Sequence, residues 1–205
     1  MLRAILAVGA MTLSMAGAAY SQPRLGPVPP AQFNAAQKKA AAEFEATRKA
    51  PMTGPFLVLM RSPEVMTASR MLGDHLRFNS AIGTTLSEMA ILITAREWSQ
   101  DYEWGVHAPI ALRQGIRKEI VDAIADARRP VGMSEDETLV YDFSTELQRN
   151  KRVSDVTYAK VLKRWGETGV VDLSAISGYY TLLAMVLNVA RTPGADGAKM
   201  SRLPE

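Results

Sequence analysis

Gln100, Glu103 and His107 carry side chains that could transfer a proton to or from a small molecule. Their spacing is i, i+3 and i+7, so on an α-helix, at about 100° per residue, all three share one face. A carboxylate four residues before a histidine can form a hydrogen-bonded pair on that face. Such a pair orients the imidazole ring and raises the basicity of its nitrogen. The spacing therefore predicts a proton-transfer site if this face turns inward.

Two consecutive helices must position these groups. We predict one helix over residues 85–99, apolar through its middle and therefore buried, and a second over residues 100–114 with polar groups on one face. Glu88 lies near the start of the first helix. It follows Thr85 at the spacing of a capping box, so it serves either as a helix cap or as a member of the site.

Glu103 and His107 also have two interpretations. They can form an ordinary i,i+4 pair on a solvated surface, or they can belong to a buried site. The side chains around them are mostly apolar, which favours partial burial. These apolar neighbours are Trp104, Val106, Ile110 and Leu112.

The composition limits the chemistry that is available. The chain has 205 residues, 47% of them hydrophobic and 22% charged, as in a globular protein with one core. It has no cysteine, which excludes disulfides and every thiol mechanism, and only two histidines, which excludes a histidine-rich metal site. The net charge of +3 and the lack of a basic, aromatic face argue against nucleic acid. We therefore expect no thiolate or histidine-rich metal site and no nucleic-acid partner.

The first 21 residues have the pattern of a secretory signal peptide. Met1-Leu2-Arg3 gives a positive start, residues 4–18 are apolar, and Ala19-Tyr20-Ser21 offers small residues before a cleavage point. The apolar run is shorter than the ~20 residues of a membrane-spanning helix. We expect a periplasmic or secreted mature protein with no stable membrane span, in which residues 22–33, with four prolines, form a linker.

The remaining segments are also helical in pattern, and no segment shows the period-2 alternation of a strand. We predict an all-α fold, a compact helical bundle over residues 34–191 followed by an extended tail over 192–205. In the helix that starts at Ser62-Pro63-Glu64, we expect Val65, Met71, Leu72 and Leu76 to face inward. The other predicted helices span residues 34–48, 117–127, 134–148, 154–166 and 170–189, and the type of the short apolar run 56–60 is left open.

Several motifs between residues 54 and 190 resemble the carboxymuconolactone decarboxylase family, which shares its helical fold with alkylhydroperoxidase D. The resemblance implies a compact helical bundle that assembles as trimers or hexamers. The motifs are Gly54-Pro55-Phe56, Ser62-Pro63-Glu64-Val65, Leu76-Arg77-Phe78, Glu88-Met89-Ala90-Ile91-Leu92, Ala95-Arg96-Glu97-Trp98, Tyr102-Glu103-Trp104 with His107, Gly169-Val170-Val171 and Gly178-Tyr179-Tyr180.

The peroxidase branch of that family uses a glutamate, a Cys-x-x-Cys pair and a histidine four residues after the second cysteine. By the resemblance, Glu88 and His107 occupy the glutamate and histidine positions, and Gln100 and Glu103 replace the two cysteines. Peroxide reduction through a disulfide needs an attacking and a resolving thiol. The peroxidase or peroxiredoxin activity of the thiol branch is therefore disfavoured for this chain.

The resemblance instead implies a decarboxylase-type enzyme, a carboxy-lyase acting on a carboxylated lactone or small organic acid. His107 would be the general acid, Glu103 would orient its ring, and Glu88 would connect it to a proton source. Arg77 or Arg96 would hold a substrate carboxylate, since guanidinium groups bind carboxylates through paired hydrogen bonds. Gln100 and Trp104 complete the expected set that binds the small-molecule substrate. The chemistry that the resemblance implies requires no metal and no organic cofactor.

A non-catalytic protein that binds a small acid, or only assembles with itself, is the alternative from another class. The distinguishing observation is geometric: catalysis requires Glu88, Glu103 and His107 to meet within hydrogen-bonding distance at a partly closed pocket.

Overall fold

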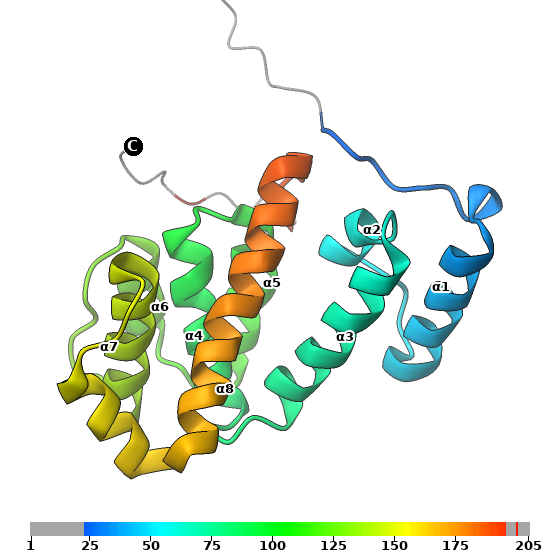
Figure 1. The fold of residues 1–205 in the computed structure, drawn as a ribbon. Helices are drawn as coiled ribbons and strands as arrows, with labels where there is room; N and C mark the ends of the chain where they lie inside the picture. Colours follow the sequence, from blue (N-terminus) through cyan, green and yellow to red (C-terminus); the bar gives the residue numbers. More distant parts are fainter. Residues whose placement is uncertain (1–22, 196–199, 201–205) are drawn as a thin grey trace, which may run out of the picture.

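The computed structural model describes residues 23–195 and residue 200. The expected signal peptide, residues 1–21, lies outside the described residues, as does most of the expected tail. Within the described part the chain forms eight α-helices, a 3₁₀ turn at Pro30–Gln32 and no strand, which confirms the all-α prediction (Figure 1). The helices are α1 (Ala35–Arg48), α2 (Pro55–Leu59), α3 (Pro63–Phe78), α4 (Thr84–Glu97), α5 (Asp101–Arg113), α6 (Lys118–Ala125), α7 (Glu135–Asn150) and α8 (Asp155–Ala190).

Local hydrogen bonds explain where several helices begin. Asn34 and Gln37 form a reciprocal capping box at the start of α1, and Ser134 and Glu137 form one at the start of α7. The Ser154 hydroxyl accepts the Thr157 N–H at the start of α8. These side chains satisfy N–H groups that have no partner inside the helix, so the chain can leave and enter helices through short loops.

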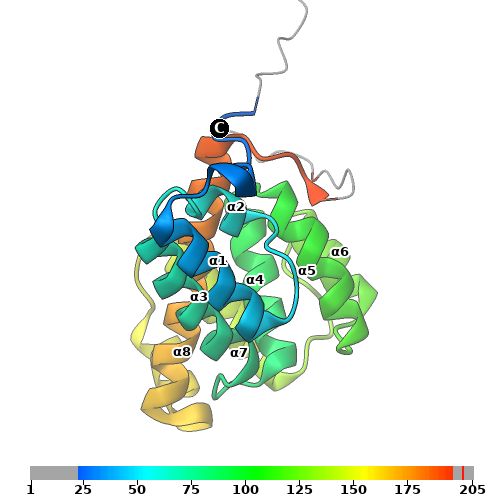
Figure 2. The ribbon, with the colours of Figure 1, turned by 90° about the vertical axis from the view of Figure 1, so that its right-hand side faces the viewer.

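Helix α4 is the centre of the bundle. Every residue from Ser87 to Arg96 is buried, and α4 packs against α5, α7 and α8. A helix that is apolar on all sides must lie in the interior, because no face of it can be left to water at low cost. In Figure 1, α8 runs between an N-terminal group, α1 to α3, and a second group, α4 to α7; Figure 2 shows α1 and α3 in front of the other helices.

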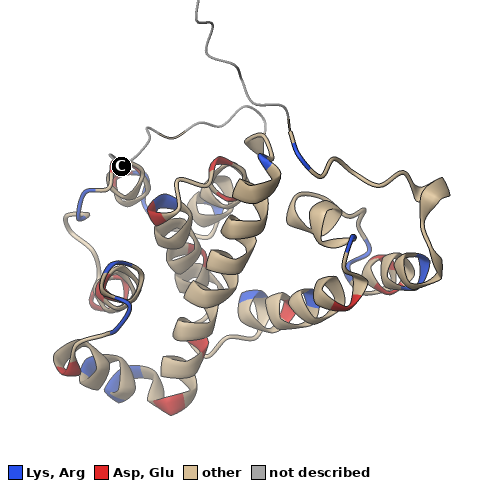
Figure 3. Ribbon diagram, turned by 45° about the horizontal axis from the view of Figure 1, so that its top comes forward, with Lys and Arg blue, Asp and Glu red and all other residues tan. Residues whose placement is uncertain are grey.

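Helix α8 consists of two helical segments that meet at a kink at Gly166, in agreement with the predicted helices 154–166 and 170–189. The backbone leaves helical geometry at Gly166, where φ is 69°, and then resumes at once. A positive φ suits glycine, which has no Cβ to clash with the backbone. By length and composition α8 could cross a membrane, yet half of its most apolar stretch is buried inside the bundle, as in a core helix. Figure 3 shows that the part of α8 beyond Asp172 carries no charged residue up to its end.

The inward face of α3 differs from the prediction. Leu76 is buried as expected, but Val65, Met71 and Leu72 are 45%, 61% and 44% exposed, so their predicted inward orientation is wrong. Packing selects another stripe of this helix, which contains small and polar residues that periodicity of apolar residues alone does not reveal. The buried stripe consists of Met66, Ser69, Arg70, Gly73 and Leu76.

Candidate active site

His107 lies between two carboxylates from two helices. Its Nδ1 is 2.6 Å from Oε2 of Glu88 on α4, and its Nε2 is 3.4 Å from Oε2 of Glu103, one turn earlier on α5. All three side chains are almost completely buried. The first distance is that of a short, charge-assisted hydrogen bond, whereas the second exceeds the usual range for an N–H to oxygen bond. Nε2 is therefore the nitrogen that a bound molecule can approach.

Glu88 does not cap the helix on which it lies. Helix α4 begins at Thr84 after Gly83, and the Ser87 hydroxyl donates to the Gly83 carbonyl. Glu88 instead turns inward and contacts His107, so the capping alternative is not what the structure shows. The short partner of the imidazole is Glu88 and not Glu103, which was expected to orient the ring. The i,i+4 spacing alone places Glu103 beside the ring, but the crossing of α4 over α5 brings Glu88 closer.

The two carboxylates change the protonation of His107. Burial alone lowers the pKa of His107, because it disfavours the charged ring. The interactions of the ring with the carboxylates of Glu103 and Glu88, together with their charges, outweigh burial and raise the pKa above its ordinary value of 6.5. The imidazolium form therefore persists to higher pH than in a free histidine. Oε1 of Glu103 is buried and has no hydrogen-bond partner among the described residues.

Two tyrosines of α8 complete the wall beside His107. The Tyr180 ring meets the imidazole in an edge-on arrangement, with ring centres 5.1 Å apart, and Tyr179 packs edge-on against Tyr180 at 5.2 Å. Burial raises the pKa of Tyr180 well above 10.0, so the phenol stays neutral at physiological pH. Sequence reasoning did not assign these residues to the site. The signal for them was the motif Gly178-Tyr179-Tyr180, with two adjacent tyrosines in the uncharged C-terminal part of α8.

A small pocket of about 80 Å³ opens beside these groups. Glu103, His107 and Tyr180 form part of its wall, and Arg48 and Arg77 form another part. Nη2 of Arg77 is 3.9 Å from Oε1 of Glu88. Arg48 was missed by sequence reasoning, because it lies at the end of α1, far along the chain from the other residues, and no local spacing connects it to them.

The other three expected substrate-binding residues lie outside this pocket. Arg96 is eight residues beyond Glu88, roughly 12 Å along the helix axis, and borders a different cavity between α4 and α7 with Tyr141. The Gln100 side chain accepts the Tyr102 N–H and donates to Asn188, so it caps α5. Trp104 packs against the hydrophobic core. The structure thus brings Glu88, Glu103, His107 and Arg77 together and leaves Arg96, Gln100 and Trp104 apart from them.

The arrangement is suited to acid/base chemistry. A protonated ring with one nitrogen held by Glu88 presents its other N–H to a pocket that two guanidinium groups, those of Arg48 and Arg77, also line. Within the described residues, no group of three or more acidic, histidine or cysteine side chains has the placement of a metal site.

Comparison with known proteins shows the fold. No family model matches the chain, and no curated protein matches it. Among solved structures, it is similar to an uncharacterised peroxidase-related protein with an alkylhydroperoxidase D core from Ralstonia eutropha JMP134, with a TM-score of 0.67 and 17% identity over 86% of this chain and 94% of that one. It is also similar to two structures of the debrominase Bmp8: the protein without ligand, and a cysteine-to-alanine variant in complex with 2,3,4-tribromopyrrole. Both structures match with a TM-score of 0.64 and 13% identity, over 84% of this chain and 92% of Bmp8. The chain therefore has the alkylhydroperoxidase D-like helical fold, as the sequence motifs indicated.

Proposed function

We propose that the chain is an acid/base enzyme of the carboxymuconolactone decarboxylase type, which acts on a carboxylated lactone or another small organic acid. The observation that carries this proposal is the buried His107, held through Nδ1 by Glu88 and presenting Nε2 to a pocket that Arg77 also lines. The similarity to solved enzymes of this fold supports an enzymatic role in general, and the specific reaction rests on the chemistry of the site.

The reaction needs a proton donor at one carbon. Decarboxylation breaks the bond between the carboxylate carbon and its neighbour, releases carbon dioxide and leaves the electron pair on the substrate, delocalised toward a conjugated carbonyl. His107 donates its Nε2 proton to that carbon, and the ring then regains a proton from solvent. A donor with a pKa close to the working pH is the most effective in this role. Glu88 keeps the ring oriented and stabilises its charged form.

Arg77 supplies the positive charge that an acid substrate requires. Its guanidinium reaches both the pocket and the neighbourhood of Glu88. We assign it to a substrate carboxylate or lactone oxygen that remains after the reaction, since a cation on the departing carboxylate would favour the ground state over the transition state.

Of the two alternative functions, one lacks its reactive group and the other is compatible with the site. A thiol-dependent peroxidase reaction has no nucleophile in a chain without cysteine. A non-catalytic protein that binds a small acid is compatible with the same pocket and arginines. The neighbour in complex with 2,3,4-tribromopyrrole supports the view that this fold can hold a small ring compound.

The direct test is release of carbon dioxide. The purified protein is incubated in D₂O with a panel of carboxylated lactones and unsaturated acids, and loss of carbon dioxide and gain of one deuterium in the product are measured. We expect at least one substrate to show both signals with the wild-type protein and neither with His107→Gln. Binding of acids without turnover across the panel would favour the non-catalytic alternative.

A further inference from the structure

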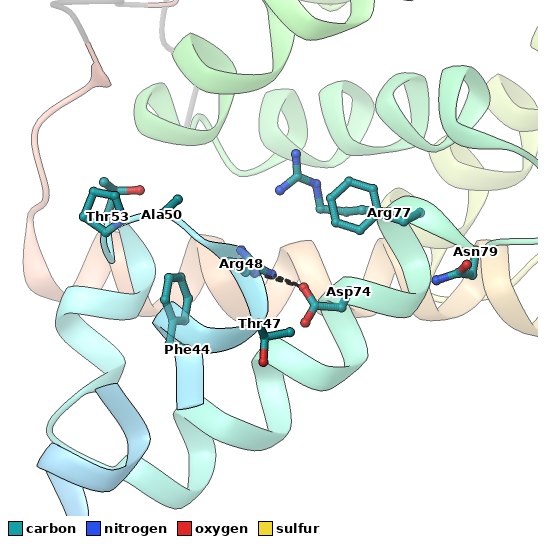
Figure 4. Close-up of a pocket in the computed structure, with 10 residues that line it drawn as sticks. Phe44, Thr47, Arg48, Ala50, Thr53, Asp74, Arg77 and Asn79 are labelled. Carbon is teal, nitrogen blue, oxygen red and sulfur yellow. Dashed lines mark hydrogen bonds and ion pairs between the residues drawn. The ribbon is translucent and has the colours of Figure 1, made fainter. Parts of the chain in front are cut away.

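A second, larger cavity adjoins the pocket of His107. It measures about 490 Å³ and lies between the end of α1, the segment that follows it and the end of α3 (Figure 4). Phe44, Thr47 and Arg48 of α1 line one side, and Asp74, Arg77 and Phe78 of α3 line the other. We call this the outer pocket and the one beside His107 the inner pocket.

The two pockets are neighbours that share part of their walls. Arg48, Thr53 and Arg77 line both of them. A molecule that extends from the outer pocket toward His107 must therefore pass these two guanidinium groups. Figure 4 shows Arg48 reaching across from α1 to Asp74, with Arg77 on the following turn of α3.

The sizes of the pockets restrict where a substrate can lie. At about 80 Å³, the inner pocket has roughly a sixth of the volume of the outer pocket, about 490 Å³. Most of the space for the body of a ligand therefore lies in the outer pocket. A substrate with a bulky body would place its reacting end beside His107 and the rest in the outer pocket.

The charges around the outer pocket favour an anion. Asp74 is the shared acceptor of two arginines: one of its oxygens is 2.9 Å from Nε of Arg48 and the other 2.9 Å from Nη1 of Arg70. Two positive groups thus face one carboxylate. The nearby Arg77 adds a third cation, whose Nη2 lies 3.9 Å from Oε1 of Glu88. The local balance is positive, so a bound carboxylate gains attraction without displacing Asp74.

Arg48 and Arg77 also have N–H groups that are free to donate a hydrogen bond to a ligand. Nη2 of Arg48 lies 2.9 Å from Asp74, but not in the geometry of a hydrogen bond, and this atom and Nε of Arg77 have no hydrogen-bond acceptor among the described residues. The Arg48 guanidinium is held over the Phe56 ring at 4.6 Å and near the Phe44 ring at 5.2 Å. Stacking fixes the plane of the group, so little conformational entropy is lost when a carboxylate binds.

We infer that the outer pocket is the second half of the ligand site, and that it binds an organic acid whose carboxylate is held by Arg48 and Arg77 while its apolar body contacts Phe44 and Phe78. The orientation of the ligand, with its reacting end toward His107, rests on the proposed function. The binding of an organic acid in the outer pocket does not depend on that function. If this inference is correct, Arg48 is a specificity-determining residue, and the substrate is an organic acid whose body is larger than the inner pocket.

The test uses 4-phenylbutyrate as the probe, with acetate and the neutral 4-phenylbutanamide as comparisons, and isothermal titration calorimetry as the readout. We expect 4-phenylbutyrate to bind more tightly than both. Arg48→Gln should weaken its binding by about tenfold or more, the loss typical of a charged hydrogen bond, and leave the amide unaffected. Arg164→Gln is the matched control, because Arg164 forms a comparable pair with Asp136 on the surface, away from both pockets.

A second variant keeps the test decisive if Arg48→Gln does not fold. Ala50 is exposed and lines the outer pocket, so Ala50→Trp should fill the cavity, leave the Arg48–Asp74 pair in place and abolish binding of the probe. Equal affinity for the acid and the amide, or unchanged binding of the acid to both variants, would overturn the inference. Because the readout is binding, absence of turnover with every acid would refute only the proposed function.

Discussion

At the scale of single residues, the two carboxylates beside His107 determine the orientation of its ring. Glu88 makes the short contact and Glu103 the long one, and they come from different helices. A ring held at one nitrogen and accessible at the other can cycle a proton without moving. Neither carboxylate needs to change its position during the reaction, so the cost of reorganising the site is small.

Replacing His107 by glutamine tests this role. Glutamine keeps a hydrogen-bonding group of similar size but cannot donate a proton near neutral pH. We expect His107→Gln to lose about 100- to 10,000-fold in kcat on a substrate found by the carbon dioxide assay, which is the usual contribution of a general acid. Circular dichroism should show unchanged helix content. Wild-type turnover in this variant would return His107, Glu88 and Glu103 to a structural role.

The raised pKa of His107 predicts a pH profile. A general acid works only while protonated, so activity should fall as pH rises through the folded-state pKa, which lies above 6.5. Glu88→Gln and Glu103→Gln each remove a negative partner of the imidazolium, and each should move this fall to lower pH. The profile of kcat against pH is the measurement. A fall that stays at the wild-type pH in both variants would contradict the assignment.

The same pKa shift links pH to stability. Because the pKa of His107 is raised on folding, its contribution to the free energy of unfolding is fully present below the unfolded value of about 6.5 and is lost as pH rises through the folded value. Thermal unfolding of the wild type and of His107→Gln over this range separates this contribution from that of other groups.

At the scale of elements, the contact between α3 and α8 positions the aromatic wall of the site. Gly73 on α3 faces the Tyr179 side chain, and a Cβ at this position would lie 2.4 Å from the tyrosine hydroxyl. Tyr179 is buried and packs against Tyr180, which in turn contacts His107. The close approach of the two helices therefore sets the position of the ring beside the imidazole.

Gly73→Ala should disturb this contact. Alanine favours a helix by up to about 1 kcal/mol over glycine, but the forced movement of a buried tyrosine costs about 1–3 kcal/mol, so we expect a net loss of stability. Gly178→Ala is the control, because no atom lies within 4 Å of a Cβ built there, and it should stabilise the helix. Thermal unfolding compares the two. An increase in Tm for both variants would show that Tyr179 has room to move.

At the scale of the whole molecule, α8 leaves apolar side chains at the surface. Val171, Leu182, Met185 and Val189 are all exposed, and the last three lie on a stretch of α8 without any charge. Exposed apolar surface of this extent on one element is typical of a subunit contact. We propose that the protein is a homo-oligomer, a trimer or hexamer, with this part of α8 at or near the contact.

Light scattering tests the assembly. The wild-type protein should be larger than a monomer at micromolar concentration, and Leu182→Glu combined with Met185→Glu should dissociate it, since a buried unpaired carboxylate is costly. Val131→Glu is the control, because Val131 is the most exposed of the large apolar residues but lies in the loop between α6 and α7. A monomeric wild-type protein would refute the proposal.

Export is a separate proposal for the whole chain. The charged start, the short apolar run and Ala19-Tyr20-Ser21 favour cleavage after residue 21 and a periplasmic or secreted mature protein. Mass spectrometry of the protein from its native host should find Gln22 at the amino terminus. An intact Met1 in the cytoplasmic fraction would contradict this.

The sequence by itself determined the features that depend on near neighbours along the chain. The capping box at Ser134 and Glu137 and the adjacency of Glu103 to His107 follow from the hydrogen-bond and side-chain geometry of one helix turn. The central position of α4 follows from its apolar residues on all sides. These interactions span at most four residues or concern one element, so they do not require knowledge of how helices cross.

Only the tertiary structure decided which distant residues meet. Glu88 and His107 are 19 residues apart, and their 2.6 Å contact depends on the crossing of α4 and α5. Arg48 reaches the pocket because α1 packs on α3, and the buried stripe of α3 is selected by the approach of Tyr179 to Gly73. Helix periodicity specifies which residues share a face, but the rotation of that face toward its neighbours is set by how all the side chains pack together.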